Sequence, residues 1–123
     1  MNVLERYPIV WRNSRKGTYS NTLKPVAAST VIEIKPHLRI KVYRYENFIN
    51  EDIDILDLKT RAYNALRRNA INTIGNLLDI YDRLPFLHNI GVTALDEIRN
   101  KFFDYYVGFL RKNGIEKVEV VDE

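Results

Sequence analysis

Alternation of apolar and polar residues dominates the first half of the chain. It runs through STVIEIK at residues 29–35 and LRIKVYRY at 38–45, and Pro36 separates the two stretches. A period of two residues is typical of strands that bury one face, so the pattern predicts two strands. The stretch 12–22 is polar, contains Gly17 and has no period, which indicates a loop or a mobile arm.

Helical spacing replaces this alternation after the acidic stretch 46–54, which we expect to be a connector. Beyond it, apolar residues recur on one face of a helix that starts at Leu58, with Asp57 as its N-cap, and ends at Asn69. These apolar residues are Leu58, Ala62, Ala65 and Leu66.

Two further helices and a last strand follow. Thr73 is the expected N-cap of a short helix at 74–81, and Gly91 opens a long helix that Gly114 ends. Residues 115–121 alternate again and predict a strand. A small sheet packed with short helices makes the expected fold class α+β.

The composition is that of a soluble globular protein, with 46% apolar and 28% charged residues. The sequence has no cysteine, which excludes disulfides, zinc–thiolate sites and thiol catalysis. No stretch has the apolar length of a signal-peptide core or a membrane span, so we expect a cytoplasmic protein with no membrane partner.

Positive charge is concentrated in the first part of the chain. Residues 1–50 carry nine Lys and Arg against three Glu, whereas residues 51–123 carry ten Lys and Arg against thirteen Asp and Glu. Such asymmetry is typical of a protein whose basic part faces a polyanion, and the alternative is an ordinary solvated surface.

Candidate catalytic chemistry is sparse. His37 and His88 lie far apart without metal-ligand spacing, and no glycine-rich phosphate loop occurs. Close aspartate pairs, such as Asp79 with Asp82, lack an accompanying nucleophile or base. We therefore expect neither an enzyme nor a bound metal or cofactor.

An almost continuous run of aromatic residues lies in the predicted long helix. Because the run covers more than one helix face, it must contact two structural layers or leave some area for a partner, and a core role is the more typical one. The residues are Phe102, Phe103, Tyr105, Tyr106 and Phe109.

Two features favour a polyanionic ligand. At 3.6 residues per turn, Arg61, Asn64 and Arg68 fall within an arc of about 60° on the flank of the first helix. LPFLHNIGVTALDEI at 84–98 has the form of a helix-hairpin-helix, whose second helix presents unpaired N–H groups to a phosphate. In the alternative, Gly91 serves only close helix packing or a positive φ.

Read together, DLKTRAYNALRRNAINTIGNLLD and LHNIGVTALDEIRNKF resemble the C-terminal domain of the bacterial RNA polymerase α subunit. That family has an L-x-x-R-x-x-N-x-L-x-x-x-x-I-x-x-I-G-x-L helix pair followed by an N-L-G-x-x-S-L-x-E-I hairpin. The resemblance covers residues 53–106. The matching residues are Leu58, Arg61, Asn64, Leu66, Ile71, Ile74, Gly75, Leu77, Asn89, Ile90, Gly91, Leu95, Glu97 and Ile98.

The resemblance implies a compact bundle of short helices that binds the minor groove of A/T-rich double-stranded DNA and offers surfaces to transcription activators in the bacterial nucleoid. Arg61 and Asn64 would enter or follow the minor groove, and the hairpin would hold the DNA backbone. We expect the DNA-binding residues to be Arg61, Asn64, Arg67, Arg68, Asn89, Gly91 and Thr93.

The hairpin also departs from the family pattern, which has lysines just after its glycine and a serine beyond them. This sequence has Val92, Thr93 and Ala94 there. The departure favours an alternative: a protein-interaction module that docks on RNA polymerase, sigma factor or a transcription regulator without significant DNA binding. In the leading hypothesis, RNA polymerase subunits or transcription factors are additional partners.

Three segments follow from these patterns. They are a basic, strand-rich extension at 1–50, the α-C-terminal-like helical domain at 51–114, and a short strand or tail at 115–123. Because the extension does not resemble the family's linker, we expect a stand-alone or fused relative of the subunit.

Overall fold

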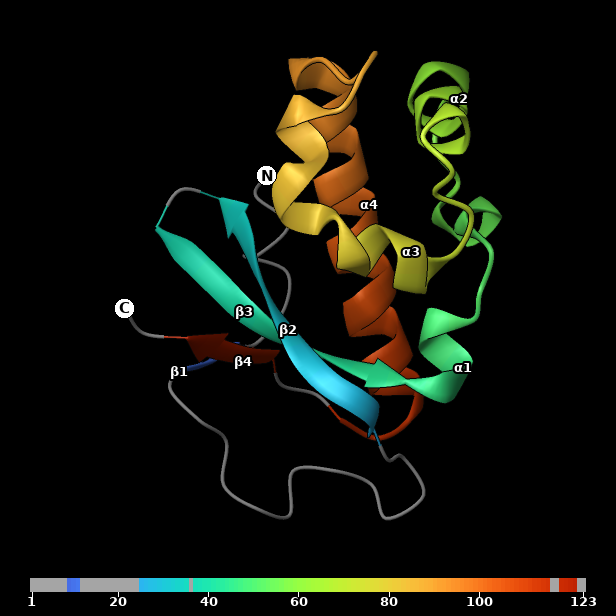
Figure 1. Cartoon of the computed structure of the whole chain (residues 1–123). Coiled ribbons are helices and arrows are strands. Elements are labelled where there is room, and N and C mark those ends of the chain that lie inside the picture. The colour runs from blue at the N-terminus through green and yellow to red at the C-terminus, as the bar shows by residue number, and fades with distance from the viewer. Residues whose placement is uncertain (1–8, 12–24, 36, 116–117, 122–123) are drawn as a thin grey trace.

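The computed structural model describes residues 9–11, 25–35, 37–115 and 118–121, and the predicted polar loop at 12–22 lies outside them. The fold is α+β, as predicted: a small sheet lies against the long helix α4, and short helices pack along the rest of that helix (Figure 1). The elements are β1 (Ile9–Trp11), β2 (Pro25–Lys35), β3 (Leu38–Tyr45), α1 (Glu46–Ile49), η2 (Ile53–Leu56), α2 (Thr60–Arg68), α3 (Ile74–Asp79), η3 (Tyr81–Phe86), α4 (Val92–Lys112) and β4 (Val118–Val121).

The sheet has the strand order β1-β4-β3-β2. β2 and β3 form an antiparallel hairpin, and β4 pairs antiparallel with β3 and parallel with β1. The predicted strands at 29–35 and 38–45 are thus confirmed, with β2 starting earlier, at Pro25, and the last predicted strand is found as β4 at Val118–Val121. Between β2 and β3 the backbone turns at His37, whose φ of 65° is the left-handed conformation found in tight turns.

One face of the sheet joins the hydrophobic core, and the other carries charged groups. Ile40 and Val42 are fully buried, because alternate residues of a strand point to one side. Lys41 pairs with Glu119 at 3.4 Å, and the same carboxylate accepts a 2.7 Å hydrogen bond from the Tyr43 hydroxyl. Part of the basic charge of β3 is therefore neutralised within the sheet.

α4 begins and ends where the sequence predicts. Gly91 is its N-cap, and Gly114, with a φ of 84°, follows its last turn. The N–H groups of Gly114 and Ile115 donate to the carbonyls of Arg111 at 3.0 Å and Leu110 at 2.8 Å, a Schellman arrangement that satisfies last-turn acceptors. No helix in the described parts of the protein, α4 included, is both long and apolar enough to cross a membrane.

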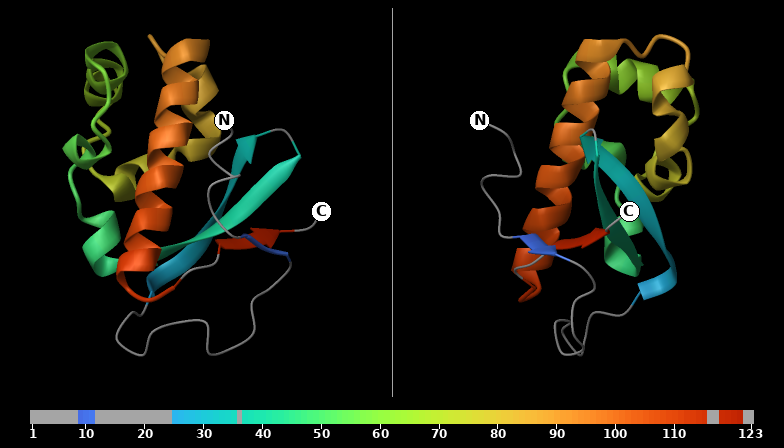
Figure 2. Two further views of the ribbon diagram at one scale, coloured as in Figure 1. Left: turned by 180° about the vertical axis from the view of Figure 1, so that it is seen from behind. Right: turned by 90° about the vertical axis from the view of Figure 1, so that its left-hand side faces the viewer.

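α4 lies between the sheet and the short helices (Figure 2), and its aromatic run contacts both layers. Toward the sheet, the Tyr106 hydroxyl accepts a 3.2 Å hydrogen bond from the N–H of Tyr43 and donates to the carbonyl of Lys41 at 3.4 Å. Toward the short helices, it surrounds the fully buried Phe48 of α1. The ring centroids that lie 5.3 to 5.9 Å from that of Phe48 are those of Phe102, Tyr105, Tyr106 and Phe109.

The acidic stretch 46–54 is not the plain connector that its composition predicts. It contains α1 and the start of η2, and Phe48 and Ile53 within it are fully buried. The N–H of Ile53 also donates to the carbonyl of Asn72 over 3.1 Å. The prediction is wrong because burial of these two apolar side chains outweighs the weak local signal of a short polar segment.

The first long helix of the second half also starts later than predicted, because Asp57 is not its N-cap. Asp57 instead ends η2 in a left-handed conformation with a φ of 54°, and α2 begins at Thr60 with Lys59 as N-cap. The N–H of Lys59 donates over 2.6 Å to a carboxylate oxygen of Glu97 in α4. A side chain from a different helix thus accepts the hydrogen bond of the N-cap residue of α2.

α3 begins at its predicted cap, Thr73. The Thr73 hydroxyl accepts a hydrogen bond from the N–H of Asn76, whose side chain accepts one from the N–H of Thr73, which completes a capping box. A Cβ added at Gly75, in the first turn, would lie 3.2 Å from the carbonyl oxygen of Ile49. A side chain here would fit only if the neighbouring backbone shifted by a few tenths of an ångström, so glycine favours the close approach of α1 and α3.

Candidate nucleic-acid interface

The exposed flank of α2 and the hairpin before α4 meet in a shallow depression of about 470 Å³. From α2 it is lined by Arg61, Asn64 and Arg68, which the helical period predicts to be neighbours. From the hairpin it is lined by Asn89. Residues almost thirty positions apart in sequence are thus brought together on one face.

A second depression, of about 400 Å³, continues the first along the start of α4. Arg61 and Asn89 line both depressions, whereas Gly91 and Thr93 line only the second. No Asp or Glu is among the lining residues, so in the described part of the protein the guanidinium groups of Arg61 and Arg68 give this face positive charge. The structure therefore gathers six of the seven predicted binding residues.

The second depression lies at the N-terminus of α4. The first bond of this helix runs from the N–H of Leu95 to the carbonyl of Gly91 at 2.9 Å. The N–H groups of residues 92–94 consequently have no acceptor within the helix, and this end is capped by no described side chain. The dipole of the 21-residue helix adds roughly half a positive charge here, which favours an anion such as a phosphate.

Asn89 and Gly91 contribute differently to the hairpin. Asn89 has a φ of 67°, a left-handed conformation that Asn adopts more readily than most residues. Gly91 is extended, with φ −92° and ψ −176°, and an added Cβ would have no atom within 4 Å besides its chain neighbours. The alternative that Gly91 serves a positive φ or close helix packing is therefore wrong. Its missing side chain leaves the helix N-terminus open.

Two side chains fix α2 against the hairpin and α4. At the start of α2, Glu97 accepts the 2.6 Å hydrogen bond from the N–H of Lys59. At its end, the Asn69 amide donates to the carbonyls of Ala65 at 2.8 Å and His88 at 3.2 Å. α2 is thus tied to α4 at its start and to the hairpin at its end. These two contacts hold the polar face in one geometry.

Arg67 is the predicted binding residue that lies elsewhere. Its Nη2 is 2.6 Å from an Asp52 carboxylate oxygen, and its Nε donates to the Tyr63 hydroxyl over 2.9 Å. The Tyr63 hydroxyl first, and then Asp52, raise the pKa of Arg67 further above its ordinary value. The N–H of Asp54, together with Arg67, holds the pKa of Asp52 below its ordinary value. Arg67 thus ties α2 to the start of η2.

Sequence reasoning misses Thr60, which lines the first depression, and the positioning contacts of Asn69 and Glu97. Thr60 precedes Arg61 and is exposed at the start of α2, but no spacing rule marks it. Glu97 belongs to the hairpin motif, which is a signal that it matters. Its hydrogen-bond partner is a backbone group 38 residues away, which local patterns do not reveal.

The fold and this face together define a small helix-hairpin-helix domain joined to a β-sheet. Residues 43–103 match the family of the C-terminal domain of the bacterial RNA polymerase alpha chain. This part of the protein is therefore an RNA polymerase alpha C-terminal-like domain. The match covers α2, α3, the hairpin and the first half of α4, and so includes every residue that lines the two depressions.

Curated relatives carry the same name across distant organisms. The DNA-directed RNA polymerase subunit alpha of Leuconostoc mesenteroides is 35% identical over 94 residues, which cover 74% of this chain and 28% of that protein. The subunit of Rubrobacter xylanophilus is 37% identical over 65 residues, which cover 52% of this chain and 20% of that protein. The matched residues therefore span less than a third of the length of these relatives. No solved structure matches the chain significantly.

Proposed function

We propose that this chain is a transcription-associated protein that binds double-stranded DNA through the α2–hairpin face. Two observations on one face carry the proposal. Two depressions without a lining Asp or Glu bring together Arg61, Asn64, Arg68 and Asn89, and the N-terminus of α4 beside them has no described side-chain cap. The family of residues 43–103 and the name of its relatives support it.

The proposed mode is minor-groove recognition of A/T-rich DNA. A narrow A/T-rich groove has enhanced negative potential, which favours the exposed guanidinium of Arg61 without a full base code. Asn64, beside it, donates hydrogen bonds to base edges or sugars. Phosphates lie against Arg68, Asn89 and the N–H groups that follow Gly91, near Thr93.

The proposed setting follows from the relatives' name. The protein acts in the bacterial cytoplasm with RNA polymerase subunits or transcription factors, as a binding protein and not as a catalyst. In the described residues no group of three or more His, Asp or Glu side chains is suited to hold a metal ion.

Fluorescence anisotropy with an A/T-rich and a G/C-rich duplex, across a salt series, tests the proposal. We expect tighter binding to the A/T-rich duplex. A plot of the logarithm of the binding constant against the logarithm of the salt concentration should have a slope of about −0.9 for each phosphate contacted. Arg61→Ala should weaken binding by about 1–3 kcal/mol.

Arg83→Ala is the matched control, because Arg83 is exposed on η3 and lines neither depression. It removes the same charge and should change affinity much less than Arg61→Ala. Equal losses for the two variants would mean that net charge alone drives binding. No binding of the folded protein at low salt would remove the DNA proposal.

A second candidate function is docking on RNA polymerase, sigma factor or a regulator without DNA binding. It is favoured by Val92, which is 77% exposed at a hairpin position where the resemblance leads us to expect a lysine. Phe86, just before the hairpin, is 85% exposed. If the duplex assay is negative, retention of purified RNA polymerase on the immobilised protein, lost in Val92→Lys, supports this candidate.

A further inference from the structure

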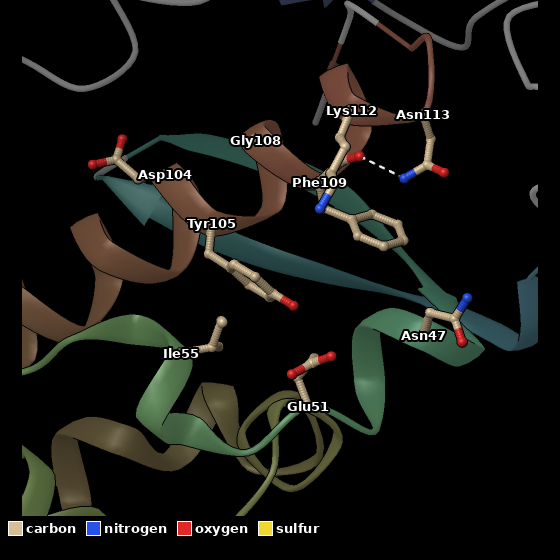
Figure 3. A pocket seen from close by; sticks show the side chains of 9 residues that line it. All are labelled: Asn47, Glu51, Ile55, Asp104, Tyr105, Gly108, Phe109, Lys112 and Asn113. Atoms are coloured by element: carbon tan, nitrogen blue, oxygen red, sulfur yellow. Dashed lines mark hydrogen bonds between the residues drawn. The ribbon is translucent and has the colours of Figure 1, made fainter.

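A groove at the other end of α4 lies apart from the proposed DNA site. Its volume is about 650 Å³, and it runs between the α1–η2 segment and the C-terminal part of α4 (Figure 3). Ile55, Tyr105 and Phe109 line it with apolar surface, and all three keep part of that surface exposed. The α4 residues that line it begin at Asp104, just beyond the matched range 43–103.

Charges of both signs line this groove. Glu51 lies on the α1–η2 side, while Asp104 and Lys112 lie toward opposite ends of the α4 side (Figure 3). Burial first, and then the Glu51 carboxylate, raise the pKa of Tyr105 to about 12, so its hydroxyl stays protonated at neutral pH. The groove thus has an acidic end, a basic end and an aromatic lining between them.

Gly108 lies at the centre of the α4 side of the groove. It is exposed, and an added Cβ would have no atom within 4 Å besides its chain neighbours and the backbone of its own helix. Glycine inside a helix is roughly 0.5–1 kcal/mol less favourable than alanine, so the described fold gives no reason for it here. A glycine does allow the backbone of another helix to approach closely.

We infer that this groove binds the same face of a second copy of the protein, with the two α4 helices crossing antiparallel at Gly108 about a twofold axis. In that packing, a residue four positions before the crossing on one helix faces a residue four positions after it on the other. Asp104 and Lys112 occupy these two positions. Each Lys112 therefore meets the Asp104 of the second copy, with Glu51 nearby.

Self-association fits the charges better than a simple charged partner does. A purely cationic ligand would face Lys112, and a purely anionic one would face Glu51 and Asp104. A twofold contact uses one patch twice and pairs both signs. Gly108 and Lys112 are exposed on this side of α4, so among the described residues it is open to a second helix. The contact spans residues 104–112, about two turns of α4, so we expect a weak, concentration-dependent dimer.

Sedimentation equilibrium over the micromolar to low-millimolar range tests the inference. The wild-type protein should dimerise. Lys112→Glu and Asp104→Lys should each dimerise about tenfold or more weakly, because each puts like charges opposite one another in its own dimer. An equimolar mixture of the two variants should regain association, since a heterodimer of one variant with the other places opposite charges at both contacts.

Gly108→Leu is a further variant, which blocks the crossing without a change of charge. Circular dichroism should show all three variants folded. A wild-type protein that stays monomeric throughout the range, or a mixture no more associated than its components, would overturn the inference. Duplex binding measured at low concentration is independent of it, because the Arg61 face lies at the opposite end of α4.

Discussion

The regions around the two ends of α4 differ in what their side chains contact. At the C-terminal half, aromatic rings pack between the sheet and α1, with Phe48 and Tyr106 buried at their centre. At the N-terminus, Arg61 and Asn89 lie exposed beside backbone N–H groups that are capped by no described side chain. One helix thus joins a region that stabilises the fold to a region that is open to a ligand. Variants at the two ends should therefore separate stability from binding.

The largest effect is expected at the aromatic end. Phe48→Ala removes a fully buried ring that packs against the aromatic rings of α4, and should lower the free energy of unfolding by about 3–5 kcal/mol. Urea denaturation followed by circular dichroism measures it. Phe86→Ala is the matched control, because Phe86 is 85% exposed and its loss should change stability by at most about 0.5 kcal/mol.

The next effect is expected near the N-terminus of α4. Glu97→Ala removes the acceptor for the N–H of Lys59 and should cost about 1–2 kcal/mol, since the bond is charged but partly exposed. Hydrogen exchange should quicken in the first turn of α2, and duplex affinity should fall although Arg61 is unchanged. Glu97→Gln keeps an acceptor oxygen and should lower stability and duplex affinity less. Unchanged exchange in Glu97→Ala would contradict the positioning role.

A smaller effect separates two buried tyrosines. Tyr106→Phe leaves the N–H of Tyr43 without its acceptor and should cost about 1 kcal/mol. Tyr81→Phe should be neutral or stabilising, because the Tyr81 hydroxyl is buried without a hydrogen-bond partner among the described residues. Burial accordingly raises the pKa of Tyr81 well above its ordinary value. Thermal unfolding of both variants compares them, and equal losses would contradict this assignment.

The smallest effect is a pH dependence on the exposed side of α2. The pKa of Asp52 lies below its ordinary value of 3.8 in the folded protein, chiefly through the N–H of Asp54 and then through Arg67. Its contribution to stability is therefore present above that value and is lost as the pH falls through the folded pKa. The stability difference between wild type and Asp52→Asn should be constant near neutral pH and vanish in strong acid. A difference that grows on acidification would contradict this sign.

Local signals predicted the helix ends whose partners are close in sequence. Thr73 and Asn76 form their capping box within one turn, and the Gly114 end is completed by the residue next to it. The helix start at Asp57 was predicted wrongly, because Lys59 receives its hydrogen-bond partner from α4. A cap supplied by a distant segment leaves no trace in the sequence around the helix end.

The candidate site follows the same rule. The helical period alone places Arg61, Asn64 and Arg68 side by side, whereas only the family resemblance joins Asn89 to them. Arg67 was also expected in the site, yet adjacent residues on a helix point in different directions, so it points away from Arg68, and Asp52 holds it. The division into segments 1–50, 51–114 and 115–123 stays a prediction.

The parallel pairing of β1 with β4 has a consequence for synthesis of the protein. More than a hundred residues separate these two strands, and β4 follows α4 in sequence. A ribosome adds about 5–20 residues per second, so the β2–β3 hairpin leaves the ribosome seconds before β4 can pair with it. Contacts among α2, α4 and the helical hairpin that precedes α4 join residues that are closer in sequence, so they form sooner. The growing polypeptide therefore acquires its proposed DNA-binding face while its sheet still has an open edge.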